Sequence, residues 1–311
     1  MIGESLSFDE LATRHRRELH LHCYRMVASF HDADDLVQET LLRAFRALAS
    51  FDASSGDNGL RAWLYRIATN ACLDFLRRTP REASRAKSFG ELPWLEPYPD
   101  RLLDELPAPT TPETLLAQRQ TLALGYLALI QRLPPRQRAI FLLREVLDWS
   151  AEETAGALTT SVAAVNSGLQ RARATLATAE YTPTETSGEE RALLAAFIDA
   201  HERGDTSASI ALMREDIRVT MPPRPVCYQG KNALLPLLAQ AFAGNMGTWR
   251  LRPTQANGQP AAVSYLRRPG DSEFRAFKID VLRTHQGQIQ ELTTFDTRLL
   301  ERFGLPLVLS D

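Results

Sequence analysis

Residues 149–178 read WSAEETAGALTTSVAAVNSGLQRARATLAT and predict two helices joined by a tight turn, the pattern of a helix-turn-helix. Ser150 stands just before two acids, which complement the dipole of a first helical turn. Thr159-Thr160 is the predicted turn, and Ser161 caps the second helix. The inward positions of that helix keep helical spacing: Val162, Val165, Leu169, Ala172 and Leu176.

The outward face of the second helix fits a groove of DNA. It has small or hydrogen-bonding residues early and basic residues later, with no acid from Ser161 to Ala179. A helix inserted in the major groove needs this order of side chains. An ordinary helical hairpin with one polar face is the alternative interpretation. The candidate DNA contacts are Ser161, Ala163, Ala164, Asn166, Ser167, Gln170, Arg171 and Arg173.

A second informative stretch, DADDLVQETLLRAFRAL, occupies residues 32–48. Asp32 is the predicted cap of an amphipathic helix, whose polar face carries acids and an amide at positions 34, 35, 38 and 39. The apolar positions predicted to face inward are Leu36, Leu41, Ala44, Phe45 and Leu48.

A further helix is predicted from RAWLYRIATNACLDFLRR, and its end opens a basic run. Between Arg61 and Lys87, seven basic residues stand against two acids, Asp74 and Glu82. Such a local basic patch is what contact with nucleic-acid phosphates requires.

Composition shifts divide the chain into five parts. Residues 1–80 and 113–180 are predicted to be helical, and residues 191–311 form an α+β domain. Residues 81–112 are rich in proline and acids and are predicted to be an extended linker that contributes to no core. The polar break YTPTETSGEE, at 181–190, is the predicted hinge.

The last part of the chain predicts two helices followed by a sheet. His285-Gln286-Gly287 marks a hairpin between its last two strands. The predicted strands are Ile217–Met221, Trp249–Gln255, Ala262–Arg267, Phe274–Arg283 and Gln288–Phe295.

Composition excludes several protein classes. A net charge of −2 argues against a general binder of polyanions, and three widely spaced cysteines support neither a disulfide framework nor a zinc site. No apolar run reaches the roughly 18 residues of a membrane span, and the amino terminus lacks a secretory signal. We expect a cytoplasmic protein without metal or cofactor, and a monomer is favoured.

The three helical stretches together resemble a known family. In this order, DADDLVQETLLRAFRAL, AWLYRIATNACLDFLRR and LPPRQRAIFLLREVLDWSAEETAGALTTSVAAVNSGLQRARATL are similar to bacterial sigma factors of the extracytoplasmic-function class. The resemblance covers roughly residues 8–180, apart from the linker. It implies an all-α region 2 domain at 1–80 and an all-α region 4 domain at 113–180.

The resemblance implies that the chain binds RNA polymerase core. In the family the helix at 32–48 binds the clamp helices of the β′ subunit, and the β flap is a second contact. The implied residues are Asp34, Asp35, Gln38 and Glu39. A solvated amphipathic helix is the alternative.

The resemblance also implies that the helix from Arg61 to Arg78 captures and melts the minus-ten promoter element. Unstacked bases are held by aromatic pockets with flanking cations. Trp63 and Tyr65 are equally suited to be core or interface residues, and Arg77 and Arg78 could favour the helix dipole instead. The implied DNA contacts are Arg61, Trp63, Tyr65, Arg66, Asn70, Arg77 and Arg78.

The helix-turn-helix would read the minus-thirty-five element, and two residues depart from the family pattern. Thr159 stands where a turn glycine is common, and Gly168 stands where an arginine is usual. We expect the glycine to weaken the recognition helix by about 1 kcal/mol relative to alanine and to remove a phosphate contact. By the same resemblance, the acidic linker threads through the polymerase toward the RNA exit path.

Residues 191–311 resemble SnoaL-like members of the NTF2-like superfamily, most clearly in MPPRPVCYQGKNALLPLL at 221–238. This implies a cone-shaped α+β domain around an apolar cavity, with Tyr228, Trp249, Phe277 and Asp296 as expected lining. His201, on a predicted surface helix, and His285, in a turn, are poor positions for a buried catalyst. Asp280 and Asp296 remain as acid–base candidates, but catalysis by this domain is not expected.

We therefore expect a multi-domain sigma factor that is not an enzyme. Its partners would be RNA polymerase core and promoter DNA, and its SnoaL-like domain would contact the sigma domains and regulate them in cis. The first alternative is a ligand-sensing helix-turn-helix regulator, which leaves the stretch at 32–48 unexplained. The second is a small-molecule enzyme built on the last domain.

Overall fold

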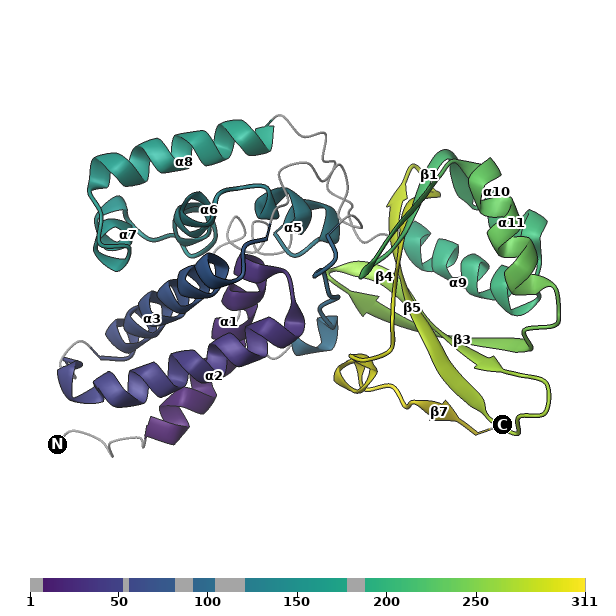
Figure 1. Ribbon diagram of the computed structural model, residues 1–311, viewed down its shortest axis with the longest axis horizontal. Helices are drawn as coiled ribbons and strands as arrows, with labels where there is room; N and C mark the ends of the chain where they lie inside the picture. The colour runs from purple at the N-terminus through teal and green to yellow at the C-terminus, as the bar shows by residue number, and fades with distance from the viewer. Residues whose placement is uncertain (1–7, 53–55, 82–91, 104–120, 178–187, 311) are drawn as a thin grey trace. The chain divides into compact units, whose positions relative to one another are not determined.

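The computed structural model describes residues 8–52, 56–81, 92–103, 121–177 and 188–310. The chain forms two compact units, one from residues 1–86 and 105–181 and the other from residues 87–104 and 182–311. The first is a helical unit and the second combines helices with a mixed sheet, as expected (Figure 1).

The helical unit begins with three helices that pack on one another: α1 (Phe8–Val27), α2 (Phe30–Ala47) and α3 (Gly56–Arg78). The short 3-10 turn η1 (Leu48–Ser50) follows α2. The start of α2 differs from expectation, because the backbone N–H of Asp32 donates to the Ser29 hydroxyl over 3.2 Å. Ser29 is therefore the cap, and Asp32 lies in the first turn, where its charge suits the dipole.

The second part of this unit contains α5 (Leu124–Gln131), α6 (Pro135–Phe141), the π-helical turn η5 (Leu142–Val146), α7 (Ala151–Ala157) and α8 (Val162–Ala177). A proline opens α6, where a missing N–H costs nothing. Ser150 and Glu153 form a reciprocal capping box at the start of α7, which the sequence indicated.

The turn between α7 and α8 places Thr159 in the left-handed region, with φ at 49°. This region is costly for a residue branched at Cβ and costs glycine nothing, so Thr159 is strained where a glycine would not be. The predicted turn position is confirmed.

A buried arginine joins the two parts of the helical unit. The guanidinium of Arg138, on α6, donates to the carbonyl oxygens of Met26, Gln131 and Leu133 and to the Gln131 side chain. The Gln131 amide in turn donates to the Arg25 carbonyl over 3.0 Å. Burial and the nearby charge of Arg81 lower the pKa of Arg138 to about 9, so it remains charged at neutral pH.

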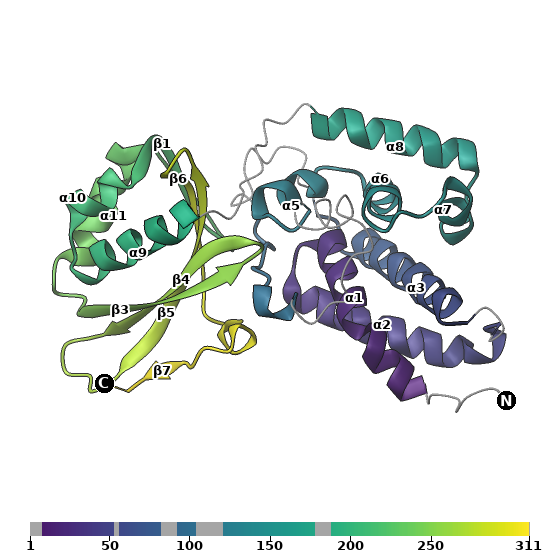
Figure 2. The same cartoon turned by 180° about the vertical axis from the view of Figure 1, so that it is seen from behind.

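The second unit is built on one sheet with the strand order β2-β1-β6-β5-β4-β3, in which β1 and β6 run parallel and the other neighbours antiparallel. Both views show α9 (Gly188–Glu202), α10 (Thr206–Ala211) and α11 (Lys231–Phe242) gathered on the same side of the curved sheet (Figures 1 and 2). An apolar core that includes Phe197, Leu234 and Trp249 lies between these helices and the strands.

All five predicted strands are present, most of them longer than expected. They are β1 (Met213–Met221), β3 (Thr248–Ala256), β4 (Gln259–Arg267), β5 (Phe274–His285) and β6 (Gln288–Phe295). The hairpin at 285–287 is confirmed, with positive φ angles at Gln286 and Gly287. Two strands were missed: β2 (Arg224–Gln229), a largely exposed edge strand that contains a proline, and the two-residue β7 (Val308–Leu309).

The structure corrects the expectation for the proline-rich linker at residues 92–103. Leu92, Leu95 and Tyr98 are almost fully buried, and the segment belongs to the second unit. The 3-10 turn η4 (Asp100–Leu102) ends it. The expectation that the linker contributes to no core is therefore wrong here, while residues 82–91 and 104–112 lie outside the described part.

The predicted hinge at 181–190 also overlaps a helix. Residues 181–187 lie outside the described part of the chain, but α9 already begins at Gly188. The acids Glu189 and Glu190 stand in its first turn, where they suit the helix dipole.

Candidate functional sites

The face of α8 predicted to contact DNA is open. Val165, Leu169 and Ala172 pack inward. The Ser161 hydroxyl accepts the backbone N–H of Ala164 over 3.2 Å, so this residue caps the helix as the sequence indicated. Arg173 forms a 2.6 Å ion pair with Glu145. The eight predicted residues are all exposed: Ser161, Ala163, Ala164, Asn166, Ser167, Gln170, Arg171 and Arg173.

Gly168 does not lie on this face, which corrects the sequence interpretation. It is buried, and a Cβ atom added there would stand 2.6 Å from Cδ1 of Ile140. The glycine allows α8 to approach α6 closely. An arginine at this position would point into the packing between the helices, so Gly168 removes no phosphate contact from the open face.

The polar face of α2 presents Asp35 and Gln38, which are exposed. The other two predicted residues are half-buried and engaged. Asp34 pairs with Arg16 over 3.4 Å, and Glu39 pairs with Arg43 over 2.7 Å.

Next to these side chains lies an apolar surface that the sequence interpretation missed. Phe45 is 62% exposed and Leu42 is 44% exposed. The prediction that Phe45 and Leu48 face inward is wrong, because α2 buries the narrower stripe formed by Leu36, Val37 and Ala44. Large exposed apolar side chains on a helix beside charged ones are typical of a protein-binding face.

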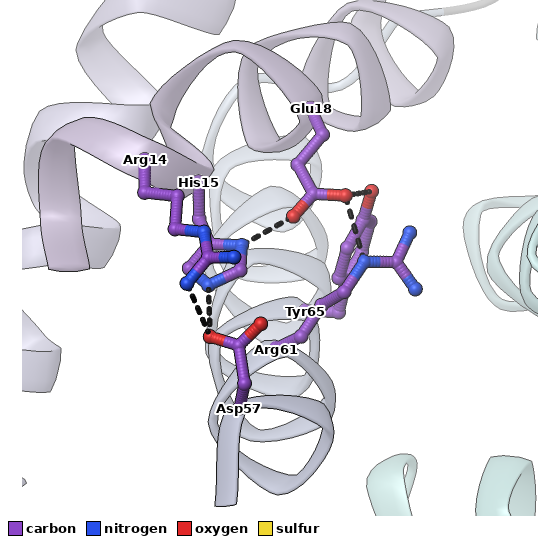
Figure 3. Close-up of polar contacts among 6 residues, drawn as sticks. All are labelled: Arg14, His15, Glu18, Asp57, Arg61 and Tyr65. Carbon is purple, nitrogen blue, oxygen red and sulfur yellow. Dashed lines mark hydrogen bonds and ion pairs between the residues drawn. The ribbon is translucent and has the colours of Figure 1, made fainter. Parts of the chain in front are cut away.

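Two of the residues predicted to touch minus-ten DNA belong to a polar cluster between α1 and α3 (Figure 3). Glu18 is at its centre. It accepts from Arg61 over 2.7 Å and from the Tyr65 hydroxyl over 3.2 Å, and it contacts His15 at 2.5 Å. Arg14 forms an ion pair with Asp57, at the start of α3, over 3.3 Å. This cluster fixes the beginning of α3 against α1.

Tyr65 is a core residue, with only 2% of its surface exposed. Its ring meets the rings of His22 and Trp149 edge-on, with centroids 5.1 and 6.4 Å away. Burial raises the pKa of its hydroxyl. The interpretation of Tyr65 as a base-stacking residue is therefore contradicted, and the core interpretation holds.

The remaining candidates on α3 differ in availability. Arg66, Arg77 and Arg78 are exposed, and Arg77 also pairs with Asp74 over 3.2 Å. Trp63 is half-buried beside Phe51. The Asn70 amide donates to the carbonyl of Arg66 and, over 3.2 Å, to that of Ala157 at the end of α7. The helix-turn-helix thus lies against this part of α3 within the helical unit.

The Glu18 cluster predicts a dependence of stability on pH. Burial raises the pKa of Glu18, but the hydrogen bond with His15 and the charge of Arg61 outweigh it, so the pKa lies below its usual 4.5. Ionised Glu18 therefore stabilises the fold above pH 4.5, and this stabilisation is lost as the pH falls through the lowered value. Glu18→Gln is expected to lower the free energy of unfolding by about 1–2 kcal/mol at pH 7 and to flatten its fall in acid.

Chemical unfolding of both proteins at pH 7 and across the acid range measures this effect. Glu39→Gln is the matched control, because Glu39 pairs with Arg43 at a more exposed site, where an ion pair contributes little. An equal loss in both variants at pH 7 would contradict the role given to Glu18.

The second unit contains a cavity of about 660 Å³ between the helices and the sheet. Trp249, Phe277 and Asp296 are among its lining residues, as the sequence suggested. Tyr228 is not among them and packs against the apolar core instead. His201, expected on a surface helix, is 3% exposed and lines the cavity, so that expectation is wrong.

The segment at 92–103 is held to the second unit by paired hydrogen bonds at Tyr98. Its N–H donates to the Asn257 side chain over 2.7 Å, and its carbonyl accepts the Asn257 N–H over 2.9 Å. Asp100 accepts the N–H of Gly258, and Arg101 donates to the carbonyl of Arg302. Asn257-Gly258 is a hairpin turn with positive φ angles. An Asn-Gly pair is a sequence signal for such a turn, but the sequence prediction did not use it, and the pair gives no information about the segment that binds there.

Within the described ranges, no group of three or more histidine, cysteine or acidic residues is arranged to hold a metal ion. No helix among the described residues is long and apolar enough to cross a membrane.

Family models match three parts of the chain: Sigma-70 region 2 at residues 11–82, Sigma-70 region 4 at 124–176 and the SnoaL-like domain at 194–292. The ECF RNA polymerase sigma factor SigG of Mycobacterium tuberculosis is 43% identical over an alignment of 312 positions, which covers 94% of this chain and 82% of SigG. SigM of the same species is 34% identical over 177 residues, which are 56% of this chain and 78% of SigM.

Among solved structures, the M. tuberculosis extracytoplasmic function sigma factor SigJ shares the fold, with a TM-score of 0.62 and 20% identity. The alignment covers 97% of this chain and all of SigJ. The order of the two sigma regions and the SnoaL-like domain agrees with the two units described above. The chain belongs to the extracytoplasmic-function (ECF) sigma factors of RNA polymerase.

Proposed function

We propose that this sigma factor binds the clamp helices of the polymerase β′ subunit through α2 and reads the minus-thirty-five element through α8. The β flap would be a second polymerase contact, made by the region 4 domain. The observation that carries the DNA assignment is that the eight predicted residues of α8 and its cap are all exposed and that none of them is acidic. Its order of small, amide and basic side chains suits insertion in a major groove.

For the minus-ten element, exposure favours Arg66, Arg77 and Arg78, with Trp63 as the aromatic partner. Arg61 acts through Glu18 to hold α3 in place. Asn70 is engaged by the carbonyl of Ala157, so the helix-turn-helix has to leave α3 before this face can receive a melted strand.

The α8 assignment predicts two distinguishable variant effects. Arg171→Ala is expected to weaken binding to all promoter sequences by a similar factor and to reduce the slope of log K against log salt by about 1. Asn166→Ala is expected to relax the preference at one base pair by roughly 1–3 kcal/mol. Binding of the complex with core polymerase to promoter fragments, measured at several salt concentrations, tests both.

Arg203→Ala removes an exposed arginine just after the end of α9 and is the matched control for charge. The control should leave the affinity and its salt slope unchanged. If Arg203→Ala and Arg171→Ala lower both quantities equally, α8 is not the DNA-reading helix.

The second unit is proposed to regulate the sigma regions in cis through residues 92–103. The hydrogen bonds with Asn257 occupy both the N–H and the carbonyl of Tyr98. They would hold residues 92–103 in place, and this segment is part of the connection between regions 2 and 4. A held connection restricts the distance that the two regions can span on a promoter. Release of this segment should therefore raise promoter output.

Asn257→Ala leaves the Tyr98 N–H without its acceptor and puts alanine at a φ of 57°. We expect a shift in Trp94 fluorescence, faster proteolysis within 92–103 and higher promoter output. Gln286→Ala, which places alanine at a similar positive φ in another hairpin, is the control. Unchanged output from Asn257→Ala and from a chain lacking residues 190–311 would show that the second unit does not regulate transcription.

A further inference from the structure

The cavity of the second unit has walls that are mainly apolar and a volume typical of small-molecule sites. Its volume, about 660 Å³, falls within the usual range of ligand pockets, roughly 300–1,000 Å³. Phe197, Leu234, Met246 and Trp249 are among the side chains that enclose it. Trp249 and Phe277 meet edge-on at 5.2 Å, so aromatic rings form part of the wall.

One polar atom in this wall lacks a partner. His201 is 3% exposed, and its Nε2 atom makes no hydrogen bond to the described residues. Its ring stands edge-on to Phe242 at 4.9 Å and to Trp249 at 5.2 Å. An unpaired buried nitrogen destabilises a fold, whereas phenylalanine would fit aromatic surroundings without that loss. The nitrogen is explained if a bound molecule supplies its partner.

The charged groups of the lining are already compensated or solvated. Lys278 pairs over 2.8 Å with Asp280, which is fully buried and also accepts the Thr294 hydroxyl. Asp296 pairs over 2.7 Å with Arg298, while Arg224 is exposed. Burial and the charge of Lys278 keep the pKa of His201 well below its usual value, so the ring is neutral. A buried charge on a ligand would therefore lack a counter-charge.

We propose that this cavity binds a neutral, mainly apolar ring compound with one hydroxyl or carbonyl group, and that His201 Nε2 is the hydrogen-bond partner of that group. A neutral imidazole suits either kind of oxygen, because its tautomer sets whether Nε2 donates or accepts. This site is independent of the promoter and polymerase surfaces, and its occupancy can be measured without transcription.

Three probes share the same two rings and differ in their polar group: naphthalene has none, 2-naphthol has a hydroxyl and 2-naphthoate has a carboxylate. Comparing them tests the apolar fit, the hydrogen bond and the exclusion of charge separately. Calorimetric titration of the full chain gives their affinities. The affinity for 2-naphthol divided by the affinity for naphthalene is expected to fall about tenfold in His201→Phe, because only 2-naphthol loses a hydrogen bond in this variant. In the unmodified protein, 2-naphthoate should bind at least tenfold more weakly than 2-naphthol, since it carries a charge.

His285→Phe makes the same change in the hairpin outside the cavity and should leave all affinities unaltered. The thermal midpoint of His201→Phe should equal or exceed that of the unmodified protein, because an unpaired buried nitrogen is removed. Should His201→Phe fail to fold, Ala241→Leu, which adds volume at the cavity wall, should weaken all three probes.

Several results would overturn the assignment. These are no binding of any probe at millimolar concentration, an unchanged naphthol ratio in His201→Phe, preferred binding of 2-naphthoate, and undiminished binding to Ala241→Leu.

Discussion

Changing Asp35 and Gln38 together to alanine is expected to weaken binding to RNA polymerase core more than a hundredfold. These two side chains are exposed on α2 beside the open apolar surface of Leu42 and Phe45. Polar side chains that flank an apolar centre hold the register of an interface, and truncation of two such residues costs about 3 kcal/mol. Titration of labelled protein with core polymerase, followed by fluorescence anisotropy, measures the loss.

Glu189→Ala removes one exposed acid from the first turn of α9 and changes the net charge by the same amount. Its affinity for core polymerase should equal that of the unmodified chain. Full core binding by the double variant would mean that α2 is a solvated amphipathic helix and that another surface holds the polymerase.

Arg138→Ala is expected to destabilise the helical unit by about 3 kcal/mol or more, because several buried acceptors lose charged hydrogen bonds. The acceptors include the Met26 carbonyl on α1 and the carbonyls of Gln131, at the end of α5, and Leu133, just after it. Since Met26 and Arg138 belong to different sigma regions, the loss should appear first as loosening between α1 and α6. Hydrogen exchange of these helices and chemical unfolding measure the two effects.

Arg136→Ala is the control for this prediction. Arg136 is an exposed neighbour on α6 that makes one hydrogen bond, to the carbonyl of Leu158, over 2.9 Å. Its loss should cost about 1 kcal/mol. If both variants unfold at the same denaturant concentration, Arg138 does not join the two regions.

The helices of the sigma regions could be predicted because their signals are local. The capping box at Ser150, the proline that opens α6 and the spacing of Val165, Leu169 and Ala172 act within one or two turns. The same holds for the open face of α8, where a residue that does not pack inward points outward. Hydrophobic alternation and a hairpin turn likewise predicted five strands of the second unit.

Four of the failures have a different cause, because each depends on contacts between distant segments. Tyr65 is suited both to a core and to base stacking, and the packing of α1 and Trp149 against it decides for the core. Gly168 is explained by Ile140 on another helix. Residues 92–103 lie in a proline-rich stretch that was predicted to be an extended linker, yet Tyr98 pairs with Asn257, 159 positions away. His201 lies on a helix whose buried side is decided by the sheet.

Initiation by the purified chain with bacterial core polymerase on a library of promoter fragments tests the central claim most directly. We predict specific run-off transcripts from fragments that share two conserved elements, and their loss when Asp35 and Gln38 are both alanine. A chain that binds those fragments but never supports initiation by active core polymerase would contradict the account, and would favour a ligand-sensing regulator.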